Sequence, residues 1–226
     1  MRYPYLLFDA DNTLFDFDRA VRYAFDASCR AVGLQSSDEL LRRYSAHNDA
    51  CWLMFDRGEA SKEFILIDRF RRFFAELGVD ADPEAANRAH LETLAVCSFP
   101  TAHSVEVCRT LARTHRLFLI TNAVASVQRG RLARAEIKPY LEAAFISEEA
   151  GAQKPTAAYF DYVFAHVDGI TRENCLVVGD SLSSDIRGAN NYGLACCWYN
   201  PKRLPNPEGL RVDYEITDLR ALYDIV

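Results

Sequence analysis

The sequence predicts an α/β protein in which a doubly wound parallel sheet is interrupted, after its first strand, by an all-helical insertion. The first observation is the apolar run Leu6–Phe8 near the N-terminus, which has the composition of a buried parallel strand. The second is that residues 17–96 carry helical apolar spacings and almost no strand-like runs. The third is that strand-like and helical segments alternate from about residue 105 onward, as they do in βαβ units.

The insertion is expected to contain four helices. Apolar residues recur at helical spacing, as at Phe70 and Phe74, and glycines fall between the helical segments, where helices commonly end. Pro83 suits the first turn of the last of these helices, with Asp82 as its N-cap. The arginines within residues 69–72 are expected on a solvated helix face.

The rest of the chain is expected to form a Rossmann-like core. The further predicted strands are Leu117–Ile120, Ala144–Ile146, Cys175–Val178 and Leu194–Trp198. The predicted helices between them are residues 105–113, 124–135, 156–167 and 184–192. The expected domains are therefore an α/β core of residues 1–16 and 97–226, which carries the candidate site described below, and a helical domain of residues 17–96.

Composition argues against several classes of partner and site. The chain of 226 residues has a net charge of -6, which argues against a nucleic acid polymer or an acidic membrane surface as its main partner. Its N-terminus runs straight into the first strand, so we expect neither a signal peptide nor a membrane span. Seven scattered cysteines without a C-x-x-C pair indicate buried, reduced thiols and a cytoplasmic location. The histidine spacings predict no zinc site.

Polar side chains follow four of the predicted strands, at the edge of an open α/β sheet where ligands bind. They are Asp9 and Asp11 after the first strand, Thr121 and Asn122 after the second, Lys154 after the third, and Asp180 and Asp185 after the fourth. Pro155 is expected in the first turn of the helix that follows Lys154. If these strand ends converge, four carboxylates share one pocket with a single lysine.

Such a pocket requires either that some of the carboxylates are protonated or that a cation lies among them. Two like charges 4 Å apart repel by about 4 kcal/mol at an effective dielectric constant near 20. Because the candidate ligands are all oxygens, a hard divalent ion such as Mg²⁺ fits best. Mg²⁺ flanked by a lysine and a threonine is arranged to bind a phosphoryl group, and a neighbouring carboxylate can attack phosphorus as a nucleophile.

These motifs resemble those of the haloacid dehalogenase (HAD) superfamily of aspartyl-phosphate phosphatases. Asp9–Thr13 matches its D-x-D-x-T motif, Thr121 its second motif and Lys154 its third. Gly179-Asp180 with Asp185 matches the fourth, and the helical insertion matches the position of the superfamily's type I cap.

The resemblance implies a role for each matched residue. Asp9 would be the nucleophile, and Asp11 would protonate the leaving group and then activate water. Mg²⁺ would be held by the Asp9 carboxylate, the Asp11 backbone carbonyl and Asp180. Asp185 would act through water or orient Lys154. Thr121, the Asn122 backbone and Lys154 would bind the phosphoryl group.

Three segments, Phe8–Phe15, Trp52–Phe55 with Gly58, and Ile146–Gly151, resemble the pyrimidine 5′-nucleotidase subgroup. The expected substrate is a small-molecule phosphomonoester, with pyrimidine nucleoside monophosphates favoured. A phosphosugar phosphatase or a β-phosphoglucomutase-like enzyme uses the same core motifs and stays open as an alternative. A phospho-accepting signalling domain combines similar residues, but the D-x-D order and the long insertion argue against it.

Three aromatic residues are candidate substrate contacts. Trp52 and Phe55 can stack on a nucleobase, but their helical spacing also suits the core of the insertion. Phe15 lies just past the first motif, where the chain enters the insertion, and has the same two interpretations.

Overall fold

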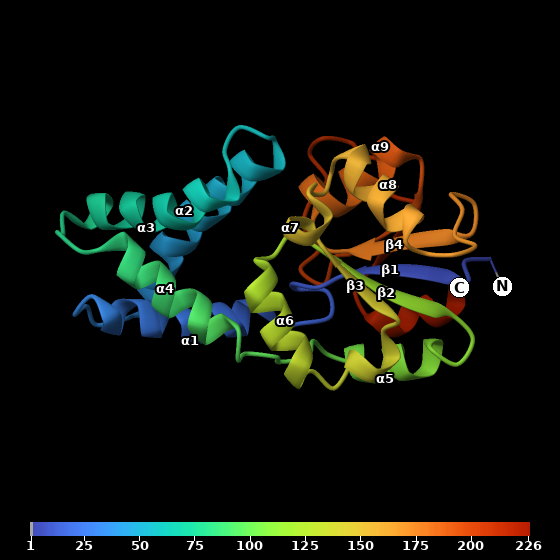
Figure 1. Cartoon of the computed structure of the whole chain (residues 1–226), viewed down its shortest axis with the longest axis horizontal. Coiled ribbons are helices and arrows are strands. Elements are labelled where there is room, and N and C mark those ends of the chain that lie inside the picture. The colour runs from blue at the N-terminus through green and yellow to red at the C-terminus, as the bar shows by residue number, and fades with distance from the viewer. Residues whose placement is uncertain (1) are drawn as a thin grey trace. The chain divides into compact units, whose positions relative to one another are not determined.

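The computed structural model describes residues 2–226, which divide into two compact units (Figure 1). One unit contains residues 2–17 together with Ser98–Val226, and the other contains Asp18–Cys97. The second unit is therefore an insertion between the first strand of the larger unit and the rest of that unit.

The larger unit is built on six parallel strands in the order β3-β2-β1-β4-β5-β6. Their bounds are Tyr5–Asp9 for β1, Arg116–Thr121 for β2, Ala143–Ile146 for β3, Cys175–Gly179 for β4, Ala195–Tyr199 for β5 and Tyr214–Ile216 for β6. Because β1 lies between β2 and β4, the carboxyl ends of these three strands meet at one edge of the sheet. The doubly wound parallel sheet expected from the sequence is confirmed.

Helices pack on both faces of this sheet (Figure 1). Their bounds are Ser104–Leu111 for α5, Ala125–Arg134 for α6, Ser147–Ala150 for α7, Ala157–Ala165 for α8 and Arg187–Tyr192 for α9, with short turns η1 (Lys138–Tyr140), η2 (Leu182–Ile186) and η3 (Leu219–Asp224). Phe8 of β1 packs in one apolar cluster with Val107 of α5, whereas Leu7 packs in a second with Phe160 of α8. Successive side chains of β1 thus enter opposite cores, which is why Leu6–Phe8 are all apolar.

Two details of the core differ from the expectation. Strand β6 has only three residues, too few to give a recognisable alternation in the sequence. The placement of Pro155 inside a helix was wrong, because α8 begins at Ala157 after the N-cap Thr156. The side chain of Asn122 bonds the backbone of Lys154 on both its N–H (2.9 Å) and its C=O (2.8 Å), which keeps this segment in a loop.

The inserted unit is made of four helices. They are α1 (Phe17–Ala31), α2 (Asp38–Asp56), α3 (Lys62–Leu77) and α4 (Pro83–Leu94). The carboxylate of Asp82 accepts a hydrogen bond from the Glu84 N–H at 2.8 Å, with Pro83 in the first turn of α4. Gly78 ends α3 with a φ of 67°, a left-handed conformation that glycine adopts without strain. The all-helical insertion expected from the sequence is confirmed.

One expectation for this unit was wrong. Arg69 is buried, and its guanidinium donates to the side-chain oxygens of Asn48 and Asn87, both at 2.9 Å. The exposed Arg71 and Arg72 instead pair with the buried carboxylate of Asp68. Each residue advances about 100° around the helix, so these arginines point in different directions. Their charge alone does not show which of them turns inward.

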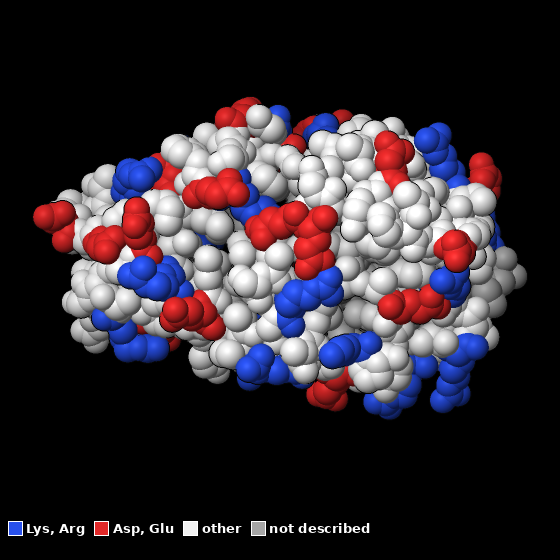
Figure 2. Space-filling view, in the orientation of Figure 1, with Lys and Arg blue, Asp and Glu red and all other residues white. Residues whose placement is uncertain are grey.

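The surface carries both signs of charge. On the face seen in Figure 2, acidic and basic side chains are interspersed. None of the helices within residues 2–226 is long and apolar enough to cross a membrane. All seven cysteines are buried free thiols.

Candidate active site

The candidate site lies where β1, β2 and β4 end. Asp9 is the last residue of β1, Thr121 is the last residue of β2, and Asp180 directly follows β4. Parallel pairing aligns these ends, since Asp9 is paired with Ile120 and Phe8 with Val178. The sheet therefore positions polar groups that are far apart in the sequence.

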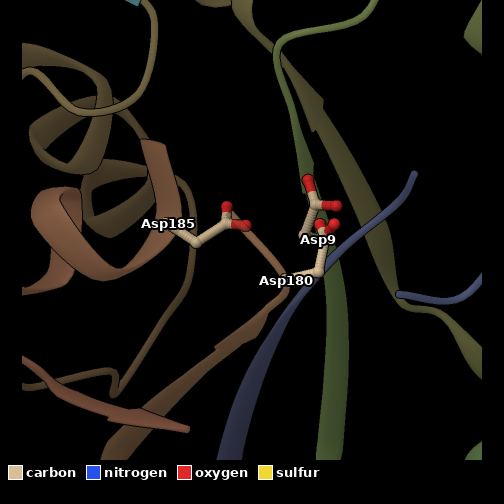
Figure 3. Close-up of side chains that lie close together, drawn as sticks. All are labelled: Asp9, Asp180 and Asp185. Carbon is tan, nitrogen blue, oxygen red and sulfur yellow. The ribbon is translucent and has the colours of Figure 1, made fainter. Parts of the chain in front are cut away.

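Three carboxylates gather at this edge. One oxygen each of Asp9, Asp180 and Asp185 lies within 4.8 Å of the others. Figure 3 shows the Asp9 and Asp180 side chains close together, with the Asp185 carboxylate directed toward them. Asp185 is completely buried, and Asp9 is 7% exposed. Buried charges of one sign require compensation by a cation or by protons.

Lys154 supplies part of that compensation. Its ammonium donates to Oδ1 of Asp9 at 2.6 Å, to Oδ1 of Asp185 at 2.7 Å and to the carbonyl of Ile120 at 3.2 Å. Its side chain is 1% exposed. An ammonium has three protons to donate, so these three acceptors fix its orientation.

The raised pKa values of Asp9 and Asp180 indicate that Lys154 alone does not neutralise the carboxylate cluster. Burial raises the pKa of Asp9 to about 7, and the charge of Asp185 adds to the rise, while Lys154 opposes it. Burial and then the charge of Asp9 raise the pKa of Asp180 well above its ordinary value. Burial alone would lower the pKa of Lys154, but Asp185 and Asp9 outweigh it and raise that pKa. An all-oxygen set of carboxylates with excess negative charge fits a hard divalent cation.

Gly179 permits the close approach of Asp185. A Cβ at residue 179 would lie 2.2 Å from Oδ2 of Asp185, closer than any non-bonded contact allows. Ser181 then caps the π-helical turn η2, and its backbone N–H donates to Oδ2 of Asp185 at 3.1 Å. Both oxygens of Asp185 are therefore engaged, one by Lys154 and one by Ser181.

The end of β2 is held by Tyr159 of α8. The Tyr159 hydroxyl accepts from the Thr121 N–H at 3.1 Å and donates to the carbonyl of Phe145 at 2.6 Å. Oγ1 of Thr121 accepts from the Ala123 N–H at 3.1 Å, so the hydroxyl proton of Thr121 can point to another acceptor. The Asn122 side chain is occupied with the Lys154 backbone.

Asp11 lies outside the carboxylate cluster. Its side chain is 27% exposed and forms an ion pair with Arg131 of α6. Of the three aromatic candidates, Phe15 is buried in the core of the larger unit, and Phe55 is buried in the inserted unit with the half-buried Trp52 packed on it. The structure thus brings Asp9, Lys154, Asp180 and Asp185 together and places Asp11 outside this cluster, whereas the aromatic candidates lie in apolar cores.

Sequence reasoning missed three residues that fix this site. They are Arg131 beside Asp11, Tyr159 between two strand ends, and Trp198, whose indole N–H donates to the Asp180 carbonyl at 2.8 Å. Trp198 and Tyr159 sit in apolar stretches, where an aromatic residue is the ordinary choice for a core. Arg131 is one of three arginines in a single short helix, and nothing in the sequence separates it from the other two.

Comparisons with known proteins agree with this geometry. A family model described as haloacid dehalogenase-like hydrolase matches residues 3–193. The pyrimidine 5′-nucleotidase PynA of Streptococcus pneumoniae is 32% identical over 99% of this chain and 95% of its own. The pyrimidine 5′-nucleotidase YjjG of Escherichia coli is 30% identical over 100% of this chain and 99% of its own. The crystal structure of YfnB from Bacillus subtilis, bound to magnesium, superposes with a TM-score of 0.95 at 31% identity, covering 100% of this chain and 99% of YfnB.

Proposed function

The chain belongs to the haloacid dehalogenase-like hydrolases and is a phosphatase, and we propose that it hydrolyses pyrimidine nucleoside 5′-monophosphates through an aspartyl-phosphate. The chemistry rests on one observation, the Asp9 carboxylate held by a buried lysine within the acidic cluster. The choice of substrate rests on two full-length relatives that are named pyrimidine 5′-nucleotidases.

In the first step, a carboxylate oxygen of Asp9 attacks phosphorus. The new bond joins Asp9 to phosphorus as the bond from phosphorus to O5′ breaks, and its electron pair goes to O5′. Asp11 gives its proton to O5′, so the nucleoside leaves as a neutral alcohol. Lys154 lies 2.6 Å from Oδ1 of Asp9 and offsets the negative charge that the phosphoryl group brings.

In the second step, water hydrolyses the aspartyl-phosphate. Asp11, now a carboxylate, takes a proton from the water as the water oxygen bonds to phosphorus. The bond between Asp9 and phosphorus breaks, which returns the Asp9 carboxylate and releases inorganic phosphate. Throughout, the Thr121 hydroxyl and the Asn122 backbone would donate to the phosphoryl oxygens, since Oγ1 of Thr121 already accepts from Ala123.

Mg²⁺ would be held by Asp9, the backbone carbonyl of Asp11 and Asp180. When bound, it supplies positive charge that lowers the electrostatic cost of bringing a phosphate dianion to a carboxylate. Asp185 would orient Lys154, because both of its oxygens already accept hydrogen bonds from the protein.

The inserted helical unit would act as a cap that selects the substrate. The half-buried Trp52 stays a candidate for contacting the base, whereas Phe15 and Phe55 are buried in apolar clusters. The YfnB structure is described as revealing interdomain movement. The seven buried free thiols support a reducing compartment such as the cytoplasm.

Mg²⁺ is expected to stabilise the folded protein more at about pH 8 than at about pH 5. Without metal, the pKa of Asp9 is raised from 3.8 to about 7. A carboxyl with a raised pKa stabilises the fold below its unfolded value, and this contribution is lost as the pH rises through the folded value. Bound Mg²⁺ replaces the proton, so a hundredfold excess over Kd should add about 2.7 kcal/mol where Asp9 is ionised.

Scanning calorimetry with Mg²⁺ or EDTA across this pH range measures the effect. The difference in Tm between the two conditions should grow with pH and shrink in Asp9→Asn. A difference of the same size at every pH would contradict the prediction.

The substrate proposal is tested with a panel of phosphomonoesters in saturating Mg²⁺. UMP, dUMP and dTMP should show a kcat/KM at least about tenfold above purine monophosphates and phosphosugars, a difference of about 1.4 kcal/mol in transition-state binding. Equal kcat/KM values across the panel would refute the nucleotidase assignment, while the phosphatase assignment would stand. A preference for phosphosugars would favour the alternative substrate class.

A further inference from the structure

Arg131 of α6 is a buried cation aimed at Asp11. Its side chain is 1% exposed, whereas that of Asp11 is 27% exposed. We propose that Arg131 is a positioning residue for the proton transfers of Asp11, an inference that rests on the proposed phosphatase mechanism. Arg131 is the rigid member of the pair and lies in the protein interior, and Asp11 is the reactive member and is partly exposed.

Several contacts fix the Arg131 guanidinium. Its central carbon lies 4.6 Å from the centre of the Phe15 ring and 5.8 Å from that of Phe17. Nη1 also donates to Oε1 of Gln128 at 3.3 Å, one helical turn back along α6. A cation stacked on aromatic faces and held by an amide oxygen has little rotational freedom.

The segment that carries Asp11 is a tight turn. Asn12 has a φ of 57°, and its N–H donates to the Phe15 carbonyl at 2.7 Å. The Asn12 side chain accepts from the Phe17 N–H at 3.1 Å. These bonds fix the backbone around Asp11. Of the two rings that stack on Arg131, that of Phe15 ends the same turn and that of Phe17 begins α1. Arg131 therefore braces the turn and the carboxylate together.

The contact divides the two oxygens of Asp11 between two tasks. Arg131 donates to Oδ1, and within residues 2–226 no other side chain donates to the Asp11 carboxylate. With Oδ1 anchored, Oδ2 is the oxygen placed to give a proton to O5′ and later to take one from water. Proton transfer requires hydrogen-bond distance to the reacting oxygen, so an unanchored carboxylate would reach that geometry less often.

The test compares Arg131→Met and Arg131→Lys with Arg134→Met, a matched control because Arg134 is exposed on the same helix. In single turnover with UMP, uridine release should slow by about 10- to 100-fold in Arg131→Met, with KM within about threefold of wild type. Arg131→Lys should fall in between, and Arg134→Met should match wild type. The burst of phenolate from an aryl phosphate should keep its rate, because a phenolate leaves without needing a proton.

A double-mutant cycle separates positioning from a purely structural role. In an Asp11→Asn background, Arg131→Met should slow uridine release by less than about a further twofold, because the carboxylate that Arg131 positions is gone. Additive losses in the cycle, or an equal loss in the phenolate burst, would overturn the inference. So would an Arg131→Lys variant that folds like wild type, by its Tm, and loses no rate with UMP.

The proposed function fails separately from this inference. It fails if wild type releases no phosphate from any monoester, or if Asp11→Asn keeps the full rate of uridine release. A wild type that is active and an Asp11→Asn variant that is impaired, together with a fully active Arg131→Met, would leave the mechanism standing and refute the role of Arg131 alone.

Discussion

Asp9→Asn should lower phosphatase turnover by at least about 10⁴-fold, or about 5 kcal/mol of transition-state stabilisation. An amide oxygen is a poor nucleophile toward phosphorus, so no covalent intermediate forms. The variant should fold, because an amide is close in shape to a carboxyl and relieves the repulsion with Asp185. The measurement is kcat with UMP in saturating Mg²⁺, together with the Tm of the variant.

Asp11→Asn is the matched comparison for Asp9→Asn. It keeps the nucleophile and removes the group that activates water, so an aryl phosphate should leave the phosphoryl group on Asp9. Intact-protein mass spectrometry after rapid acid quench should find this added phosphoryl mass in Asp11→Asn and find none in the double variant with Asp9→Asn. Turnover by Asp9→Asn close to wild type would refute the covalent mechanism.

Lys154→Met should impair both activity and stability. The methionine fills a similar volume but leaves the carboxylates of Asp9 and Asp185 without the cation that lies 2.6 and 2.7 Å from them. Removing one partner from a buried ion pair costs about 3–5 kcal/mol of folding free energy. Turnover should fall by about 10²–10³-fold, the size of effect seen when a donor to the transition-state charge is removed.

Lys138→Met is the control for this variant, because Lys138 is exposed in the short turn η1. Chemical denaturation with and without Mg²⁺ measures the stability of both proteins. Mg²⁺ should recover part of the stability lost in Lys154→Met, since it also compensates the carboxylates. Equal stabilities for Lys154→Met and wild type in EDTA would show that Lys154 is not the required counter-charge.

The sequence predicts most of the fold because local pattern and tertiary role agree there. Residues Leu6–Phe8 of β1 are buried on both faces of the sheet, so this run is apolar without interruption. Asp82 and Pro83 mark the start of α4 by chemistry that acts within one turn. Strand β6 cannot be predicted from its sequence in this way, because its pairing with β5 depends on tertiary contacts and its three residues carry no pattern of their own.

Some residues of the candidate site are likewise predictable from the sequence, and others are not. Asp9 and Asp180 are predictable because a charge beside an apolar strand is conspicuous in the sequence, and the topology then brings these strand ends together. Lys154 is predictable only from its place in the order of the matching motifs. Arg131 and Arg69 are not predictable, since each lies among other arginines and only the packed structure shows which side chain is buried. The sequence therefore identifies the groups that react more readily than the groups that hold them.

Strand β1 has a consequence for how the chain is made. It is synthesised before the other strands of the sheet, yet both of its hydrogen-bonded neighbours, β2 and β4, come from beyond residue 115. The bond between Asp9 and Lys154 spans 145 positions. The helices of Asp18–Cys97 contact mainly one another, so their partners are available early in translation. Strand β1 stays without both neighbouring strands until most of the polypeptide has been synthesised. Nascent chains that stop before β4 would present β1 as an open edge that chaperones must shield from aggregation.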